Sequence, residues 1–114
     1  MIQENQNEDQ HAMGMKLDKD KPDVSLLFDF GRALMAVSEV GTFGAKKYAR
    51  GSWVMVPDGI SRYTAAMGRH LLAEGMGEAH DAESGLRHAA HAAWDSLARL
   101  DLMLREEETW KKGQ

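Results

Sequence analysis

Cysteine is absent from this 114-residue chain, and the chain also lacks a long apolar run and an excess of basic charge. Without cysteine it has no disulfide scaffold, thiolate zinc site or thiol nucleophile, so any metal site must use His, Asp and Glu. No segment approaches the roughly 20 apolar residues of a membrane span, and the polar N-terminus lacks a signal-peptide pattern. The 14 basic and 18 acidic residues give a net charge of −4, which offers nucleic acid no electrostatic attraction. We therefore expect a single cytoplasmic domain that binds neither nucleic acid nor membrane.

Hydropathy divides the chain into one domain and two tails. Residues 1–15 carry almost nothing that could be buried, so we expect a flexible N-terminal tail. Residues 16–108 hold the apolar pattern and form the predicted domain, and residues 109–114 form a short C-terminal tail. The domain opens with the alternating charges of KLDKDKP, which fit either a solvated linker or a segment whose Lys21 reaches a ligand.

Apolar residues at spacings of three and four predict helices along the whole domain. The first begins at Leu27 and is expected to fray or kink over Gly41–Gly44, where glycines enter the pattern. A loop over residues 49–60 leads to a second helix, which starts at the N-cap residue Ser61 and stops near Gly75. No β-branched alternation of any length occurs, so the predicted fold class is all-α, a small helical bundle.

The third predicted helix, residues 84–107, has two distinct faces. Its apolar seam consists of residues three or four positions apart: Leu86, Ala90, Ala93, Leu97, Leu100 and Leu104. At about 100° per residue, His88, His91 and Asp95 share the opposite side. Burying these polar groups is costly unless other side chains, a metal or a second subunit satisfy them. A helix covered on both sides in so short a chain predicts a homodimer or a homotetramer.

The densest group of titratable side chains lies between residues 78 and 95. Eight side chains there can bind a divalent ion or carry a proton: Glu78, His80, Asp81, Glu83, Ser84, His88, His91 and Asp95. Carboxylates are the ligands that Mg²⁺ or Mn²⁺ prefers. In a purely structural alternative, Asp81 or Ser84 caps the third helix, Glu83 meets its positive end, and the histidines are hydrogen-bonded core residues. The H-E-x-x-H pattern of zinc metallopeptidases does not occur.

Basic and aromatic residues form separate groups nearby. Lys46 and Lys47 close the first helix, and Arg69 lies within the second. These cations could bind phosphate, with Lys as a point charge and Arg as a bidentate donor, although the lysines also suit the negative end of a helix dipole. Tyr48 and Trp53 flank a loop and could stack on a purine, although Trp also anchors small cores.

Several blocks of the chain, taken in order, resemble the phage dATP/dGTP diphosphohydrolase domain family, an all-α relative of the MazG-like nucleoside triphosphate pyrophosphohydrolases. The blocks are TFGAKKY at 42–48, Trp53, RY at 62–63, RH at 69–70, GE at 77–78, Asp81, ESGL at 83–86, His88 and His91. Residues 16–22 are similar to the family's lysine-rich N-terminal segment. The resemblance implies hydrolysis of dATP or dGTP to the monophosphate and pyrophosphate in phage nucleotide metabolism, and hence in the host-cell cytoplasm, with Mg²⁺ or Mn²⁺ as cofactor.

On this resemblance we expect divalent ions to be held by Glu78 and Asp81, with His70, His91 or Asp95 alongside. Two departures from the family pattern bear on this set. Asp95 replaces the usual asparagine, and no E-E-x-x-E precedes the E-x-x-D of residues 78–81, so His70 and Glu74 are the candidates for the missing ligands.

The remaining expected roles concern the substrate. Lys46, Lys47 and Arg69 would hold phosphate oxygens, with Lys47 and Arg69 also contributing to catalysis, and Lys21 would add a further contact. Tyr48 and Trp53 would cover the base, and Glu83 would orient or deprotonate the attacking water. Two alternatives stay open: a non-catalytic helical module that binds a host or phage protein through its leucine seam, and a metal-dependent phosphohydrolase that cleaves a different bond.

Overall fold

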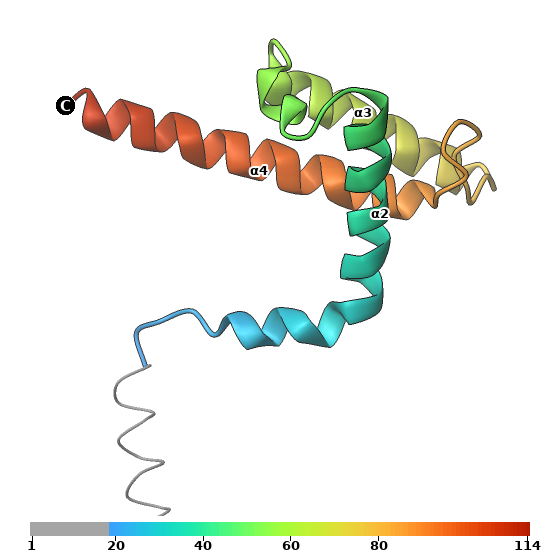
Figure 1. Cartoon of the computed structure of the whole chain (residues 1–114), viewed down its shortest axis with the longest axis horizontal. Helices are drawn as coiled ribbons and strands as arrows, with labels where there is room; N and C mark the ends of the chain where they lie inside the picture. Colours follow the sequence, from blue (N-terminus) through green and yellow to red (C-terminus); the bar gives the residue numbers. More distant parts are fainter. Residues whose placement is uncertain (1–18) are drawn as a thin grey trace, which may run out of the picture. The chain divides into compact units, whose positions relative to one another are not determined.

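The computed structural model describes residues 19–114, so the predicted tail of residues 1–15 lies outside the described residues. Its elements are η1 (Val24–Phe30), α2 (Gly31–Lys47), η2 (Ser52–Met55), α3 (Gly59–Gly75) and α4 (His88–Lys112) (Figure 1). Within residues 19–114 no strand forms, which confirms the all-α fold class. None of the helices in this range has the length and apolar character needed to cross a bilayer.

The described residues divide into two units, one that ends at Gly31 and one that runs from Arg32 to Gln114. In the first, η1 begins after Asp23, whose carboxylate accepts hydrogen bonds from the backbone N–H and hydroxyl of Ser25. The helix predicted to start at Leu27 is a tighter 3₁₀ helix up to Phe30, and the α-helix begins only at Gly31.

Helices α3 and α4 dominate the second unit, where they lie side by side and antiparallel (Figure 1). The Leu102 side chain of α4 packs closely against the backbone at Gly59, since a Cβ there would lie 2.7 Å from Leu102 Cδ1. Helix α3 begins at this glycine, so the prediction of Ser61 as its N-cap was wrong by three residues. The N-cap is Asp58, in a left-handed conformation with φ 53°, and its side chain makes no capping hydrogen bond.

Helix α2 runs without interruption through Gly41–Gly44, so the expected kink or fraying is absent in this described segment. The reason for glycine is steric, because a Cβ on Gly41 would lie only 2.6 Å from Trp94 Cζ3 on α4. The buried residues of α2 are Val37 and Val40, which lie on the same side of the helix as Gly41. Gly41 therefore permits the close contact between α2 and α4.

Helix α4 starts four residues later than predicted, at His88 instead of Ser84. Gly85 has φ +73°, a conformation that ends regular helix, and residues 84–87 belong to the connecting loop. At the other end, α4 continues through Lys112, into the segment that the sequence assigned to a C-terminal tail.

The buried face of α4 is the one that carries its polar groups. His88, Ala90, Ala92, Asp95 and Ala98 are buried, whereas the seam leucines Leu97, Leu100 and Leu104 are 53%, 52% and 49% exposed. Within the described residues, the leucine seam is therefore only partly covered over this half of the helix. Small alanines allow α4 to sit close to its neighbours, which leaves the larger leucines on the outside.

Candidate active site

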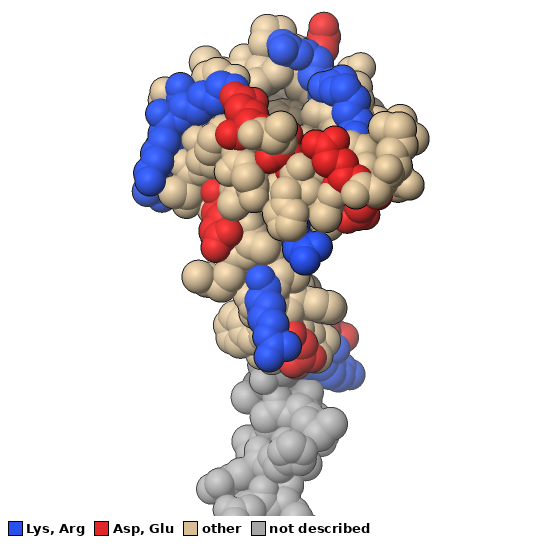
Figure 2. Space-filling model, turned by 90° about the vertical axis from the view of Figure 1, so that its right-hand side faces the viewer, with Lys and Arg blue, Asp and Glu red and all other residues tan. Residues whose placement is uncertain are grey.

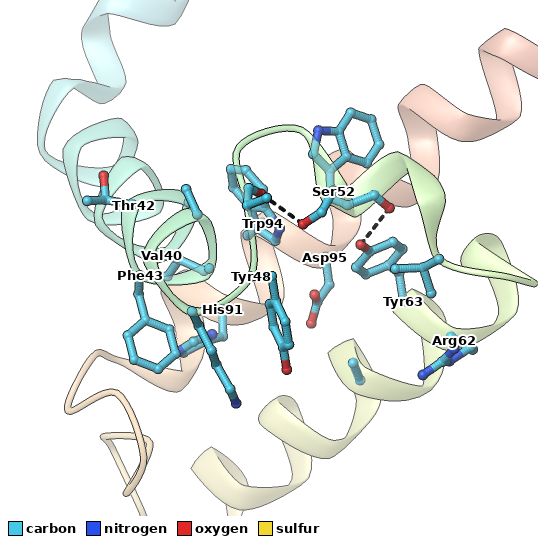
Figure 3. Close-up of a pocket in the computed structure, with 18 of the residues that line it drawn as sticks. Val40, Thr42, Phe43, Tyr48, Ser52, Arg62, Tyr63, His91, Trp94 and Asp95 are labelled. Atoms are coloured by element: carbon cyan, nitrogen blue, oxygen red, sulfur yellow. Dashed lines mark hydrogen bonds between the residues drawn. The ribbon is translucent and has the colours of Figure 1, made fainter.

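An open pocket of about 1210 Å³ lies within the second unit, lined by residues of α2, η2, α3, α4 and the loops between them (Figure 3). It gathers nine of the residues predicted from the sequence: Lys47, Tyr48, Trp53, Arg69, His70, Asp81, Glu83, His91 and Asp95. Lys46 and Glu78 are not among its lining residues, and Lys21 belongs to the other unit. One pocket thus collects most of the predicted metal-binding, cationic and aromatic groups.

The pocket is also lined by residues for which the sequence predicted no role in the site, among them Arg50, Arg62, Tyr63 and Trp94. Arg50 lies two positions after the KKY block, and Arg62 and Tyr63 lie at the start of the second predicted helix. The positive charges of Arg50 and Arg62, close to the predicted loop, could have indicated these positions. Trp94 gave no such indication, because a tryptophan next to a helix seam is typical of a core position.

Three histidines meet where α3 approaches the start of α4. The Nδ1 atoms of His70 and His88 are 2.8 Å apart, and the His70 ring stacks on His91 with centroids 4.5 Å apart and an angle of 9°. His70, Asp81 and His88 each offer a ligand atom, and these atoms all lie within 4.8 Å of one another. The predicted ligands Glu78, His91 and Asp95 lie outside this group, and His88, not chosen from the sequence, belongs to it.

His88 is buried and faces an acidic neighbour. Its Nε2 lies 3.4 Å from Glu78 Oε1, within ion-pair range, although this nitrogen makes no hydrogen bond in the described structure. The hydrogen bond from the His88 backbone N–H to the Ala79 carbonyl fixes the start of α4 against the loop. Glu78 therefore lies behind the histidine ring, on the side away from His70.

The loop between α3 and α4 is held by its own side chains. Asp81 Oδ2 accepts a hydrogen bond of 2.9 Å from the Ser84 N–H, and the Ser84 hydroxyl lies 2.7 Å from His91 Nε2 and accepts from the Leu86 N–H. Asp81 and Ser84 thus stabilise a turn in the loop before α4, seven and four residues ahead of its first residue. The suggestion that either residue caps the helix itself was wrong. This turn presents Asp81 to the histidines.

Local electrostatics favour neutral His70 and His91 and ionised Asp81 near pH 7. Burial, reinforced by the neighbouring His91 and His88, lowers the pKa of His70. Burial also lowers the pKa of His91, and Asp81 only partly opposes it. Burial raises the pKa of Asp81, but hydrogen bonds from Ser84 outweigh this effect and bring it below its ordinary value. Neutral imidazole and ionised carboxylate are the forms that bind metal ions.

Lys47 and Glu83, both predicted to be catalytic, form an ion pair at the rim of the pocket. Hydrogen bonds to Glu83 and to Tyr48 raise the pKa of Lys47, so the ammonium is charged across the physiological range. On the face shown in Figure 2, Lys and Arg side chains lie among Asp and Glu side chains. The pocket accordingly combines cations with acids instead of presenting a surface of one sign.

Asp95 lies in the pocket apart from the histidine group. It is only 7% exposed, and its Oδ2 has no hydrogen-bond partner among the described residues. Burial raises its pKa to about 7, an effect that the positive charge of Arg69 partly opposes. Figure 3 shows its carboxyl group directed into the pocket, with Tyr48 on one side and Tyr63 on the other.

Comparison with known proteins gives one consistent relationship. Residues 11–112 match the family model described as "dATP/dGTP diphosphohydrolase, N-terminal". A curated relative, the "dATP/dGTP diphosphohydrolase" of Salmonella phage PMBT28, is 39% identical over 80 residues, which cover 70% of this chain and 26% of the relative. The chain therefore spans about a quarter of the length of that relative, and no solved structure matches it. With its family model matched over nearly the whole sequence, the chain belongs to the dATP/dGTP diphosphohydrolase N-terminal family.

Proposed function

We propose that this protein hydrolyses deoxypurine nucleoside triphosphates, dATP or dGTP, to the monophosphate and pyrophosphate with the help of a divalent metal ion. The observation that carries the proposal is a pocket in which His70 and Asp81, two members of the metal-ligand group that His88 completes, lie together with cationic and aromatic side chains. The name of the phage relative supports the choice of substrate.

The donor set suits a transition-metal ion better than magnesium. His70 and His88 offer imidazole nitrogens and Asp81 offers a carboxylate oxygen, and imidazole ligands suit transition-metal ions, whereas Mg²⁺ prefers oxygen ligands. When bound there, the ion would lower the pKa of a coordinated water and neutralise charge on the phosphates. Glu78, 3.4 Å from His88 Nε2, would orient that ring from behind, as carboxylates commonly do for metal-bound histidines.

The cations of the pocket would position the triphosphate. Lys47 supplies a charged ammonium held in place by Glu83, and Arg69, Arg50 and Arg62 line the same space. Arginine can bind two phosphate oxygens at once, which fixes their orientation as well as their charge. Glu83 remains our candidate for orienting the attacking water, since its carboxylate lines the pocket on the same loop as Asp81.

The test is product analysis with each of the four deoxynucleoside triphosphates, first with Mn²⁺ and then with Mg²⁺. We expect dGMP or dAMP with pyrophosphate, separated by ion-exchange chromatography. Asp81→Asn should lower turnover by about 100-fold or more, while the control His80→Gln, an exposed histidine of the same loop that does not line the pocket, should not. Release of triphosphate or orthophosphate would point to a different bond cleaved, and unaffected turnover in Asp81→Asn would remove this residue from the metal site.

We also propose that the chain associates with itself through the exposed seam of Leu97, Leu100 and Leu104. These leucines form one stripe along α4, and a stripe of this kind can pair with its own copy about a two-fold axis. Light scattering coupled to size-exclusion chromatography should give a multiple of 12.7 kDa, and Leu100→Glu should reduce it to the monomer mass. A wild-type mass of 12.7 kDa would contradict self-association. Together with an absence of turnover, it would favour the seam as a docking surface for another protein.

A further inference from the structure

Asp95 is a buried acidic residue that does not belong to the metal-ligand group. It is 7% exposed, its Oδ2 has no partner in the described structure, and the side chain is directed into the pocket. Buried polar atoms in proteins nearly always find a hydrogen-bond partner, because an unpaired buried carboxyl group is costly. The missing partner is therefore expected to be supplied by the molecule that fills the pocket.

The surroundings of Asp95 are aromatic. Tyr48, Trp53, Tyr63 and Trp94 line the same pocket, and Figure 3 places Tyr48 and Tyr63 on either side of the Asp95 carboxyl group. The Tyr63 hydroxyl donates its hydrogen bond to the Trp53 carbonyl at 2.8 Å, so this proton is committed elsewhere. Flat aromatic side chains around one carboxyl group suit a planar ring that stacks against them and presents hydrogen-bond donors at its edge.

Asp95 also lies at a distance from the metal-ligand group that one nucleotide can span. His88 and Asp95 are seven residues apart on α4, almost two full turns, so they share a face about 10 Å apart along the helix axis. A deoxyribose can bridge this separation when phosphate lies beside the histidines and the base lies beside Asp95.

Resting on the nucleotide substrate of the proposed function, we propose that Asp95 reads the base and selects guanine. Above its pKa of about 7, the Asp95 carboxyl group is ionised and only accepts hydrogen bonds. The Watson–Crick edge of guanine presents two adjacent donors, the ring N1–H and the 2-amino group, which match the two carboxylate oxygens. Adenine presents an unprotonated N1 at the corresponding position, which would place an acceptor against an acceptor. Asparagine, with one donor and one acceptor, matches the adenine edge instead.

The experiment compares kcat/KM for dGTP, dITP and dATP with Mn²⁺ at about pH 8, where Asp95 is mostly ionised, in the wild type, in Asp95→Asn and in the control Asp101→Asn. Deoxyinosine triphosphate keeps the N1–H but lacks the 2-amino group, so it isolates one of the two contacts. We expect the wild type to favour dGTP over dATP by about 10-fold or more, with dITP between them. Asp95→Asn should abolish or reverse this order, whereas Asp101→Asn, an exposed aspartate on the same helix, should keep it.

Several outcomes would overturn the assignment of Asp95: an unchanged ratio of dGTP to dATP in Asp95→Asn, equal use of dGTP and dITP by the wild type, or a wild-type preference for dATP. Failure of the proposed function looks different, because the wild type would then hydrolyse none of the three nucleotides. Calorimetric titration of the same three nucleotides with Ca²⁺ in place of Mn²⁺ measures the base preference without hydrolysis. A preference for dGTP that is lost in Asp95→Asn would support the assignment even then, and equal affinities would refute it.

Discussion

Replacing Asp95 with asparagine should make the folded protein more stable, and the gain should grow as the pH rises. Burial raises the pKa of Asp95 from its ordinary 3.8 to about 7 in the folded chain. Between these two values the unfolded chain releases the proton while the folded chain retains it. The folded state therefore loses stability as the pH rises through this window, and asparagine, which does not titrate, removes the loss.

The magnitude follows from the shift in pKa. A difference of about three pH units, at about 1.4 kcal/mol per unit, corresponds to about 4 kcal/mol of destabilisation once the pH exceeds 7. Below about pH 4 the carboxyl group is protonated in both states, so the effect vanishes. Between about pH 5 and about pH 8, the free energy of unfolding of Asp95→Asn should rise by about 2.5 kcal/mol relative to that of the wild type.

The assay is urea unfolding followed by circular dichroism across this pH range, at one fixed protein concentration so that association does not alter the comparison. The titration of the histidines is common to both proteins and cancels in the difference. Asp101→Asn, whose side chain is about half exposed, serves as the control and should follow the wild-type profile. Parallel pH profiles for the wild type and Asp95→Asn would refute the reasoning, because they would show that Asp95 ionises normally in the folded chain.

Three further predictions concern the surroundings of the pocket. Gly41→Ala should lower the free energy of unfolding by about 1–3 kcal/mol, because its Cβ would meet Trp94 at 2.6 Å, whereas Gly44→Ala, with open space around the new Cβ, should not; thermal unfolding measures both, and equal effects would contradict the close contact. Glu83→Gln should raise KM for the nucleotide while changing stability by less than about 1 kcal/mol, since the Lys47–Glu83 pair is exposed; steady-state kinetics with urea unfolding test this, and an unchanged KM would show that the pair does not position Lys47. Because burial lowers the pKa of His70 and of His91, their side chains are protonated in the unfolded chain at a higher pH than in the folded chain, and the free energy of unfolding should fall as the pH drops below about 6.5. In urea unfolding, His70→Gln should reduce this loss of stability at acid pH. An unchanged loss would count against a lowered pKa of His70.

The fold class was predictable from the sequence, but the buried side of α4 was not. Spacings of three and four identified the helices correctly. The same pattern identified the leucine seam but not what covers it: Leu97 and Leu100 are half exposed, whereas Ala92 and Ala98 are buried. Periodicity finds an apolar stripe but cannot tell whether it faces the same chain or another molecule.

The predicted boundaries of the helices were wrong where a single residue determines the backbone conformation. Gly85, with φ +73°, keeps residues 84–87 out of α4, although Ser84 followed by an apolar pattern is typical of a helix start. Gly41 suggested a kink but instead admits Trp94 against an unbroken helix. The cause is a local backbone conformation at Gly85 and a contact between distant residues at Gly41. The spacing of apolar residues predicts neither of them.

Much of the site was foreseeable because its chemistry is concentrated in the sequence. Lys47, Asp81 and His91 were identified by residue type and spacing, and all three line one pocket. The pairing of His70 with His88 across two helices was not foreseeable, since it depends on how α3 and α4 pack. Spacing along one helix favoured His91 as a ligand, whereas its Nε2 lies 2.7 Å from the Ser84 hydroxyl.

The central claim is that the pocket lined by His70 and Asp81, whose metal-ligand group His88 completes, splits a deoxynucleoside triphosphate into monophosphate and pyrophosphate. Phosphorus NMR of dGTP incubated with the wild-type protein and Mn²⁺, read after removal of the metal, tests this claim most directly because it distinguishes pyrophosphate from orthophosphate and triphosphate. We predict dGMP and pyrophosphate in equal amounts, with the reaction slowed by about 100-fold or more in Asp81→Asn. Unchanged dGTP after incubation with a folded, manganese-loaded wild-type sample would contradict the account.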